Sequence, residues 1–185
     1  FIPIISPPHV LRARWKKKKL YLENISNKMR SLRTRLTKDL KSDDEKEFLT
    51  ALVISVMDCT AERVGNDDSA RNGHFGCTGF RKKHIRINGN QITFRYTGKS
   101  GVKHEKIITD SSLAENLKRA IKNSKSRFVF ETSDGFRIRN DKVNRYLSDF
   151  GIKSKNIRGY CANTYVIEKL KKEPIPPLKG DKGDV

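Results

Sequence analysis

Residues 83–109 read KHIRINGNQITFRYTGKSGVKHEKIIT, and their pattern predicts a three-stranded antiparallel meander. Lys83–Ile87 has the composition of a short strand, and the dipeptide Asn88-Gly89 after it is a strong hairpin signal. Gln91–Tyr96 then alternates apolar and polar side chains with the period of a strand. Because His104–Thr109 is again strand-like and a glycine-bearing loop precedes it, we expect a second hairpin and a small sheet.

The tripeptide GKS at 98–100 does not belong to a nucleotide-binding loop. Such a loop requires G-x-x-x-x-G-K-[ST] between a strand and a helix. Thr93 stands where the first glycine is needed, and a strand rather than a helix follows. We therefore expect no nucleotide cofactor. Lys99 lies at the tip of the second hairpin, either as an ordinary solvated lysine or as a ligand for another kind of phosphate.

Apolar residues at helical spacing predict helices on both sides of this sheet. The segments with this spacing are 45–64, 112–123, 140–150 and 154–172. Ser112 and Glu115 form a capping box, Asn140 or Asp141 caps the third helix, and Gly151 ends it. Residues 127–131 read as one more small strand. The fold class is therefore α+β, a mainly helical domain with a small three-stranded antiparallel sheet.

The two ends of the chain differ from this core. We assign 1–41 to a basic N-terminal arm and helix, 42–172 to the core, and 173–185 to a Pro/Gly-rich linker or tail. Residues 1–11 read as extended. Residues 12–41 carry a narrow apolar stripe on a basic helix, which can have a solvated charged face, lie along nucleic acid, or lead in from another domain.

Charge indicates the kind of partner. The 185 residues contain 40 Lys and Arg against 21 Asp and Glu, which gives a net charge of +19 and a pI of about 10.0. A charge of this size favours a polyanion, which can be DNA, RNA or an anionic membrane surface. No run of 18 or more apolar residues is present, so we expect no membrane span.

The three cysteines and four histidines do not predict a disulfide framework or a metal site. The cysteine count is odd, no C-x-x-C pair occurs, and the histidines are scattered along the chain. We expect an intracellular protein with reduced thiols and no structural metal. Cys59 and Cys161 fall in helical segments, where we expect small core residues.

Three cations are distinguished by their positions. Arg63 ends the helix at 45–64, seven residues after Val56, and so falls on its buried stripe. Arg158 is in the first turn of the last helix, and Lys99 is at a hairpin tip. Arg63 can form a buried ion pair or face a cleft that receives an anion. Two arginines and a lysine in one place would suit a phosphodiester in a pentacoordinate transition state.

Three stretches together resemble a known family. AERVGNDDSARNGHFGCTGFRKKHI at 61–85, YTGKSGVKHEKII at 96–108 and IKSKNIRGYCANTYVIEKL at 152–170 resemble the catalytic domain of type IB DNA topoisomerases, above all the small poxvirus, giant-virus and bacterial forms. The resemblance covers about 30–170. Tyrosine recombinases share this fold, but they typically carry an H-x-x-R motif, which is missing from this sequence.

The resemblance implies a role for each matching residue. Arg63 and Arg158 would bind the scissile phosphate, and Lys99 would protonate the departing 5′ oxygen. The residues implied to contact DNA are Lys155, Asn163, Asn66, Arg81, Lys82, Lys103 and His104. The implied reaction forms a 3′-phosphotyrosyl link, lets the free strand swivel and reseals it, without ATP or a metal. The implied partner is duplex DNA, not a membrane, bound by a monomer at intracellular DNA.

The nucleophile is the point where the sequence departs from the family. The family's tyrosine lies beyond a Pro-rich linker after the second arginine, and the tyrosines here are Tyr21, Tyr96, Tyr146, Tyr160 and Tyr165. For Tyr165, seven residues after Arg158, we expect core packing. We therefore expect a fragment of the enzyme that lacks the nucleophile and the N-terminal DNA clamp. The alternatives are a non-catalytic DNA-binding relative, a recombinase or integrase, and a membrane-surface protein.

Overall fold

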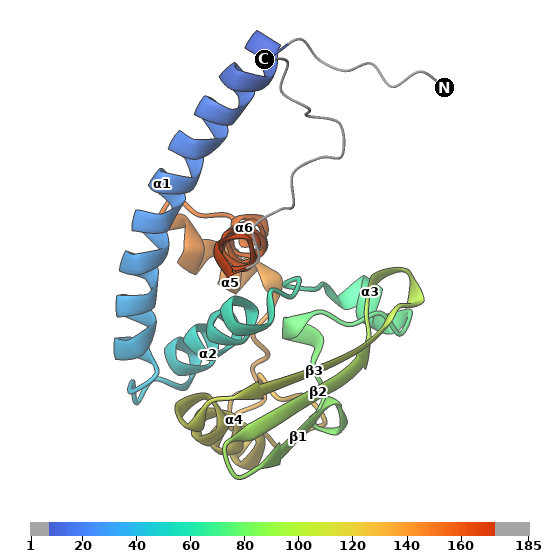
Figure 1. Ribbon diagram of the computed structural model, residues 1–185. Helices are drawn as coiled ribbons and strands as arrows, with labels where there is room; N and C mark the ends of the chain where they lie inside the picture. Colours follow the sequence, from blue (N-terminus) through green and yellow to red (C-terminus); the bar gives the residue numbers. More distant parts are fainter. Residues whose placement is uncertain (1–7, 173–185) are drawn as a thin grey trace.

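The computed structural model describes residues 8–172, and α2 is the centre of its fold. The elements are α1 (Pro8–Asp39), α2 (Glu45–Thr60), α3 (Asp67–Arg71), β1 (Ile85–Asn88), β2 (Gln91–Thr97), β3 (Lys103–Thr109), α4 (Ser111–Asn123), α5 (Asn140–Ser148) and α6 (Ser154–Lys172), with short 3₁₀ turns at Cys77–Gly79, Lys82–His84 and Lys99–Gly101. Helix α2 packs against α1, α4, α5 and α6. The sheet and α4 lie together below it in Figure 1.

Helix α2 is apolar on nearly all sides, as a central helix must be. Its buried residues run from Phe48 to Met57 with the exception of Ser55. Asp44 caps its start, because the carboxylate accepts the N–H groups of Lys46 and Glu47. The helix ends at Thr60, four residues earlier than predicted, because Ala61 adopts a left-handed conformation with φ 54°.

The early end of α2 corrects the expected position of Arg63. A helix through 64 would have placed this side chain on the buried stripe. Arg63 instead lies on the loop after Ala61, where its side chain is exposed. The buried ion pair considered from the sequence is absent, since Arg63 has no carboxylate partner among residues 8–172.

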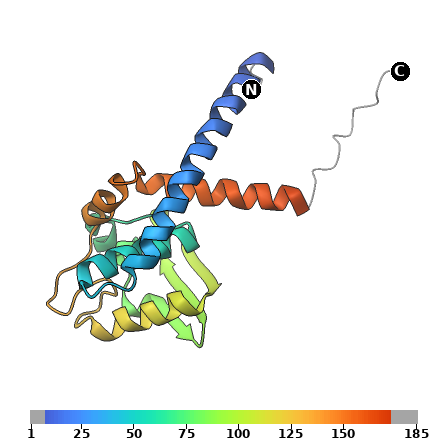
Figure 2. The same ribbon diagram turned by 90° about the vertical axis from the view of Figure 1, so that its left-hand side faces the viewer.

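Helix α1 packs along one side of the body and then leaves it. Ile25, Met29, Leu32 and Leu36 are buried in the predicted stripe, whereas Leu20 is 68% exposed. Figures 1 and 2 show the N-terminal part of α1 standing clear of the other elements. The helix begins at Pro8, so the extended prediction was wrong for 8–11; proline fits a first helical turn. The predictions for 1–7 and 173–185 lie outside the described residues.

The predicted meander is confirmed. The strands pair antiparallel in the order β1-β2-β3, and Ile85 faces Phe94 while Tyr96 faces His104. Gly89, in the first turn, has φ +59°. The strand expected at 127–131 is absent: this segment makes only single bridges, because the chain turns back at Gly135.

The helices after the sheet follow the prediction, with different caps. Asp110 rather than Ser112 caps α4, since its carboxylate accepts the N–H of Leu113 at 2.8 Å. Arg139, which makes no side-chain cap, takes the N-cap position of α5 that we expected for Asn140 or Asp141. The described helices include none that is long and apolar enough to cross a membrane.

Of three side chains expected in the core, Cys59 and Tyr165 lie elsewhere, and Cys161 packs against its edge. Cys59 is exposed, on the side of α2 that turns outward. Cys161 is half-buried at the edge of the core, where its thiol donates to the Asp58 carbonyl oxygen at 3.2 Å. Tyr165 is 62% exposed, because the C-terminal half of α6 extends past the body (Figure 2).

Candidate active site

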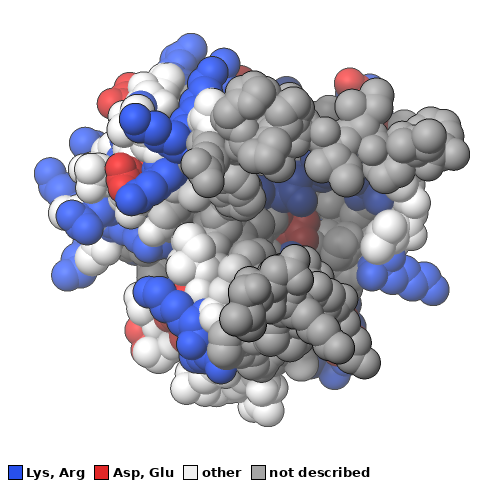
Figure 3. All heavy atoms as spheres, turned by 45° about the horizontal axis from the view of Figure 1, so that its top comes forward, with Lys and Arg blue, Asp and Glu red and all other residues white. Residues whose placement is uncertain are grey.

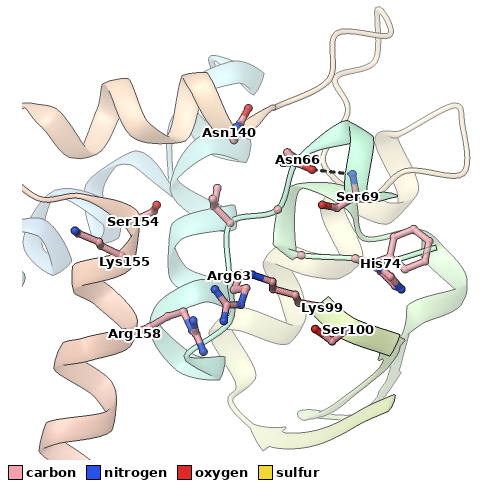
Figure 4. A pocket seen from close by; sticks show the side chains of 14 residues that line it. Arg63, Asn66, Ser69, His74, Lys99, Ser100, Asn140, Ser154, Lys155 and Arg158 are labelled. Carbon is pink, nitrogen blue, oxygen red and sulfur yellow. Dashed lines mark hydrogen bonds between the residues drawn. The ribbon is translucent and has the colours of Figure 1, made fainter. Parts of the chain in front are cut away.

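A cleft of about 630 Å³ lies at the C-terminal end of α2, and it receives all three of the cations singled out by position. Its lining residues are Arg63, Val64, Gly65, Asn66, Ser69, His74, Phe75, Gly76, Lys99, Ser100, Asn140, Ser154, Lys155 and Arg158. Figure 4 shows the side chains of Arg63, Lys99 and Arg158 gathered in one part of this cleft. They come from the loop after α2, the tip of the β2–β3 hairpin and the first turns of α6.

Backbone contacts fix the loop that carries Arg63. Its carbonyl oxygen accepts the N–H of Cys77 at 2.9 Å, and the Val64 carbonyl accepts the N–H of Thr78 at 2.9 Å. Gly65 and Gly76 pack backbone against backbone, so a Cβ on Gly76 would lie 2.5 Å from the Cα of Gly65. Because the loop is held through its main chain, the guanidinium of Arg63 stays free to meet a ligand.

Arg158 joins α6 to this loop. Its Nε donates to the Ala61 carbonyl oxygen at 2.9 Å, two residues before Arg63. The side chain is half-buried, so its direction is set, and the guanidinium has further N–H groups for an anion. Lys155, almost one turn earlier on α6, is exposed and lines the same cleft.

The hairpin that carries Lys99 is a tight and irregular turn. Gly98 donates its N–H to the Val102 carbonyl oxygen at 2.7 Å, and Ser100 and Gly101 adopt φ of 63° and 75°. A Cβ on Gly98 would lie 2.6 Å from Nε2 of His104, so only glycine allows the ring of His104 to pack against the turn. Lys99 itself is exposed, with no acceptor among residues 8–172.

Glu62, which the sequence did not single out, connects the two loops. One of its carboxylate oxygens lies 2.5 Å from Nζ of Lys106 and 4.0 Å from Nδ1 of His104, both on β3. Lys106 also donates to the Thr60 carbonyl oxygen at 2.6 Å. Burial raises the pKa of Glu62, but the bond and charge of Lys106 outweigh this and hold the pKa below its ordinary value. The pairing across 44 positions leaves no local signal in the sequence.

All charged residues in the described lining of the cleft are positive. Four of its described lining residues are Arg or Lys, and none is Asp or Glu. Unpaired cations on facing walls raise the local concentration of anions and bind phosphate oxygens strongly. The described residues also contain no group of three or more His, Cys, Asp or Glu side chains that could hold a metal. The arrangement can bind a phosphate on several sides and stabilise added negative charge.

Of the residues predicted to contact DNA, Lys155 and Asn66 line the cleft. Asn66 also caps α3, because its side-chain oxygen accepts the N–H of Ser69 at 2.8 Å. Lys103 is exposed at the start of β3 but does not line the cleft. Arg81 also lies outside the lining, with its guanidinium 4.8 Å from the centre of the Phe75 ring.

Three further predicted contacts are engaged within the protein. Nζ of Lys82 donates to the Ser124 carbonyl oxygen at 2.7 Å, and Nδ2 of Asn163 donates to the Gly159 carbonyl oxygen at 2.5 Å. The ring of His104 stacks on Tyr96 with 5.1 Å between centroids. None of the three lines the cleft: Lys82 ties its turn to the end of α4, His104 packs within the hairpin, and Asn163 bonds within its own helix.

The sequence reasoning missed several polar lining residues. They are Ser69, His74, Ser100, Asn140 and Ser154. His74 follows Gly73, whose φ of +77° turns the loop back toward the cleft. The turn signal Asn72-Gly73 in the loop after Arg63 was the available hint, but it does not say which way the next side chain points.

No tyrosine lines the cleft among the five in the chain, all of which fall within 8–172. Tyr96 is only 6% exposed, and Tyr146 donates to Oδ2 of Asp39 at 2.7 Å. Tyr160 lies under the guanidinium of Arg33, 5.4 Å from its ring centre. The cleft therefore has cations but no phenol in position to attack a phosphate.

Comparison with known proteins gives matches of three kinds. The family described as "Eukaryotic DNA topoisomerase I, catalytic core" matches residues 12–183. DNA topoisomerase 1B of Acanthamoeba polyphaga mimivirus is 28% identical over 141 residues, which cover 69% of this chain and 41% of that protein. The chain thus spans less than half the length of this curated relative.

The fold is also that of a solved recombinase. The XerH site-specific recombinase bound to difH substrate, in a pre-cleavage complex, matches with a TM-score of 0.54 and 12% identity over 77% of this chain and 42% of that chain. A post-cleavage complex of XerH with palindromic difH matches with a TM-score of 0.56 and 13% identity over 77% and 41%. At this identity the likeness concerns the fold, and it agrees with the predicted fold class.

Proposed function

The chain belongs to the family of eukaryotic DNA topoisomerase I catalytic cores, and on this premise we propose that it is the catalytic core of a type IB DNA topoisomerase. The activity is relaxation of supercoiled duplex DNA by cleaving one strand and resealing it. The observation that carries the proposal is the convergence of Arg63, Lys99 and Arg158 in one cleft that has no acidic residue among its described lining.

Each cation has a step to perform. A tyrosine oxygen attacks the phosphorus of the scissile diester and forms a 3′-phosphotyrosyl bond, while the bond to the 5′ oxygen breaks. Arg63 and Arg158 bind the non-bridging oxygens, where charge builds up in the transition state. Lys99 gives its proton to the departing 5′ oxygen. The reverse sequence reseals the strand after it has rotated, so that neither ATP nor a metal is consumed.

The attacking tyrosine is proposed to come from outside these 185 residues. This follows from the cleft, which none of the five tyrosines lines. Lys155 and Asn66 are proposed to contact the DNA backbone beside the scissile phosphate, and Lys103 to approach it from the hairpin. Lys82 and His104 are better explained as positioning residues, because the ammonium of Lys82 is bonded and the ring of His104 is stacked inside the protein. Asn163, whose bond stays within α6, is still proposed to contact DNA. The proposed partner is duplex DNA, bound by a monomer at intracellular DNA.

The test uses the protein encoded by the complete reading frame that contains this chain. Negatively supercoiled plasmid is incubated with it in EDTA and without ATP, and a denaturing gel reports protein joined to the 3′ end of a cleaved strand. We expect relaxation and a covalent adduct, and loss of both in the triple variant with alanine at 63, 99 and 158. An adduct that maps to Tyr165 would contradict the proposed origin of the nucleophile, and no relaxation at all would contradict the activity.

A non-catalytic DNA-binding relative is the second candidate, because the cleft has no tyrosine. On that reading the complete protein binds duplex DNA and never forms an adduct. A recombinase is a third candidate, because the fold is similar to that of XerH. It is distinguished from a topoisomerase by supplying two duplexes and measuring strand exchange between them. Relaxation without exchange supports the topoisomerase.

A further inference from the structure

A second group of arginines lies beside the cleft, and we call Arg81, Arg127 and Arg137 the arginine platform. The segments that carry them meet through a backbone bridge between Arg81 and Phe128 and through the N–H of Lys82, which donates to the Arg127 carbonyl oxygen at 2.8 Å. Only Arg81 was expected to reach DNA from the sequence. The other two arrive from the loop between α4 and α5.

Aromatic rings hold the platform guanidiniums in place. Arg81 lies over Phe75 at 4.8 Å, whereas Arg137 and Arg127 both approach Phe128, at 3.6 and 5.2 Å. A guanidinium stacked on a ring keeps its plane, and its N–H edges are then pre-oriented for a planar or tetrahedral anion. Little side-chain entropy remains to be lost when such an anion binds.

The platform lacks enough negative charge of its own. Within residues 8–172, Arg81 and Arg127 have no carboxylate partner, and Arg137 shares Asp67 with Arg139 at 3.0 and 3.2 Å. In the described part of the chain, nothing accepts a hydrogen bond from the buried Nε atoms of Arg81 and Arg137. Burial, together with the charges of Arg127 and Arg137, lowers the pKa of Arg81. Like charges brought together without partners are costly unless an anion completes the group.

The platform adjoins the cleft on two sides. Phe75, on whose ring the guanidinium of Arg81 lies, lines the cleft. Asp67 directly follows Asn66, and Arg139 directly precedes Asn140, and both of these asparagines line the cleft as well. A polyanion with one phosphate in the cleft would therefore pass the platform as it leaves, whereas an isolated small anion would need no second site there.

We propose that Arg81, Arg127 and Arg137 form a second phosphate-binding site, which holds the backbone of duplex DNA beside the phosphate in the cleft. The choice of ligand rests on the proposed function. The site positions the duplex and takes no part in the chemistry. Lys82 is not a member, because its ammonium is bonded to the Ser124 carbonyl oxygen.

The test measures binding of this chain to a fluorescent duplex across a range of salt concentrations. The platform double variant R81Q/R127Q is compared with K38Q/K41Q, which removes the same charge from exposed lysines at the other end of α2. The 16 residues of α2 span roughly 24 Å, so the control lies far from the cleft. Each phosphate contact contributes about 0.9 to the slope of log K against log salt. We expect the platform variant to lose about 1 to 2 in slope and the control to lose less than half of that.

Single and conservative variants keep the test informative. Arg127 is exposed, so R127Q alone should fold normally, as checked by its melting temperature, and should still lose about 1 in slope. R81K/R127K keeps the positive charges but loses the planar, two-pronged guanidinium groups. Its salt slope should fall between those of the wild type and the glutamine variant. Equal slopes for platform and control variants would overturn the second site while leaving the proposed function intact. Failure of the wild-type chain to bind duplex at all would overturn both.

Discussion

The charged cluster around Asp39 at the start of α2 and the cations of the cleft at its other end differ in whether their charges are already paired. At its N-terminal end, Arg35 bonds Asp39 at 2.7 Å and Glu47 at 3.0 Å, and Tyr146 donates to the same Asp39, which is 1% exposed. At its C-terminal end, Arg63 and Lys99 face the cleft with no acceptor among the described residues. We call these the paired end and the open end.

Whether a charge is paired distinguishes structural from functional charged residues. The net charge of the chain cannot make this distinction. With a net charge of +19, basic residues cover more of the face drawn in Figure 3 than acidic ones, and most of them are solvated. A cation whose donors are satisfied inside the protein stabilises the fold. A cation held in place by its backbone, with its donors left over, is ready for a ligand.

The largest effect is expected from the arginines at the open end. Arg63→Ala or Arg158→Ala in the complete enzyme should lower the rate of single-turnover cleavage about 10²–10³-fold, because each removes a preorganised donor to the transition state. Duplex affinity should stay nearly unchanged, since many other phosphate contacts remain. The measurement is adduct formation in rapid-quench experiments beside equilibrium binding.

The matched control for these variants is Arg35→Ala at the paired end. It removes the same charge from the same helix bundle and should leave the cleavage rate of the folded protein within about twofold, because Arg35 lies at the far end of α2. If Arg63→Ala lost affinity in step with its cleavage rate, the role of Arg63 would be to position DNA, and the open end would have no special status.

Lys99 should behave as a proton donor and not only as a positive charge. Lys99→Ala should slow cleavage of an ordinary diester by about 10²-fold or more. A substrate with a sulfur in place of the departing 5′ oxygen should restore most of the rate, because sulfur leaves without being protonated. The same substrate should not rescue Arg63→Ala. A Lys99→Ala variant that stays equally slow on both substrates would contradict the general-acid role.

The paired end should govern folding instead. Asp39→Asn removes a buried carboxylate that serves both Arg35 and Tyr146, and it should lower the free energy of unfolding by about 2 kcal/mol, less than for a fully buried pair because Arg35 is half exposed. Arg63→Ala should change it by no more than about 0.5 kcal/mol. Urea titrations of both variants give the comparison, and equal losses would show that pairing does not separate the two ends.

The sequence predicted the parts of this contrast that depend on local pattern. The meander of 83–109 and the apolar stripe of α2 have periods that are readable along the chain, and both were confirmed. The three cations of the cleft were predicted from their positions at element ends. Their gathering in one cleft needed the resemblance, since nothing in the spacing of 63, 99 and 158 brings them together.

The features that could not be predicted from the sequence depend on the backbone conformation of single residues and on contacts between distant segments. The left-handed backbone of Ala61 ends α2 early and turns Arg63 outward, yet alanine gives no warning of it. The bond from Glu62 to Lys106 and the meeting of Arg81 with Arg127 join segments more than 40 positions apart. Such contacts are decided by the packing of the whole domain.

The smallest expected effect concerns His84, which is buried and has no carboxylate partner among residues 8–172. Burial and the nearby charges of Lys83 and Arg81 lower its pKa to about 4. In the unfolded chain its pKa is about 6.5, so the unfolded state takes up a proton first as the pH falls. The contribution of His84 to stability is therefore complete above pH 6.5 and is lost progressively between pH 6.5 and 4.

The variant His84→Asn isolates this contribution. Between pH 6.5 and 5 the wild type should lose about 1.5 kcal/mol more unfolding free energy than the variant, because the slope rises to its full value of about 1.4 kcal/mol per pH unit only below pH 6. Asparagine keeps an acceptor for the N–H of Arg81, which His84 accepts at 3.2 Å, but it does not titrate. The pKa of Glu62 is held below its ordinary value, so its contribution is lost only as the pH falls through about 4.5, the pKa of the unfolded chain, and both proteins share this loss. Parallel pH profiles for the two proteins would show that His84 is hydrated enough to titrate with its ordinary pKa. Burial of a side chain would then predict its protonation less well than the presence or absence of a charged partner, which distinguishes the two ends of α2.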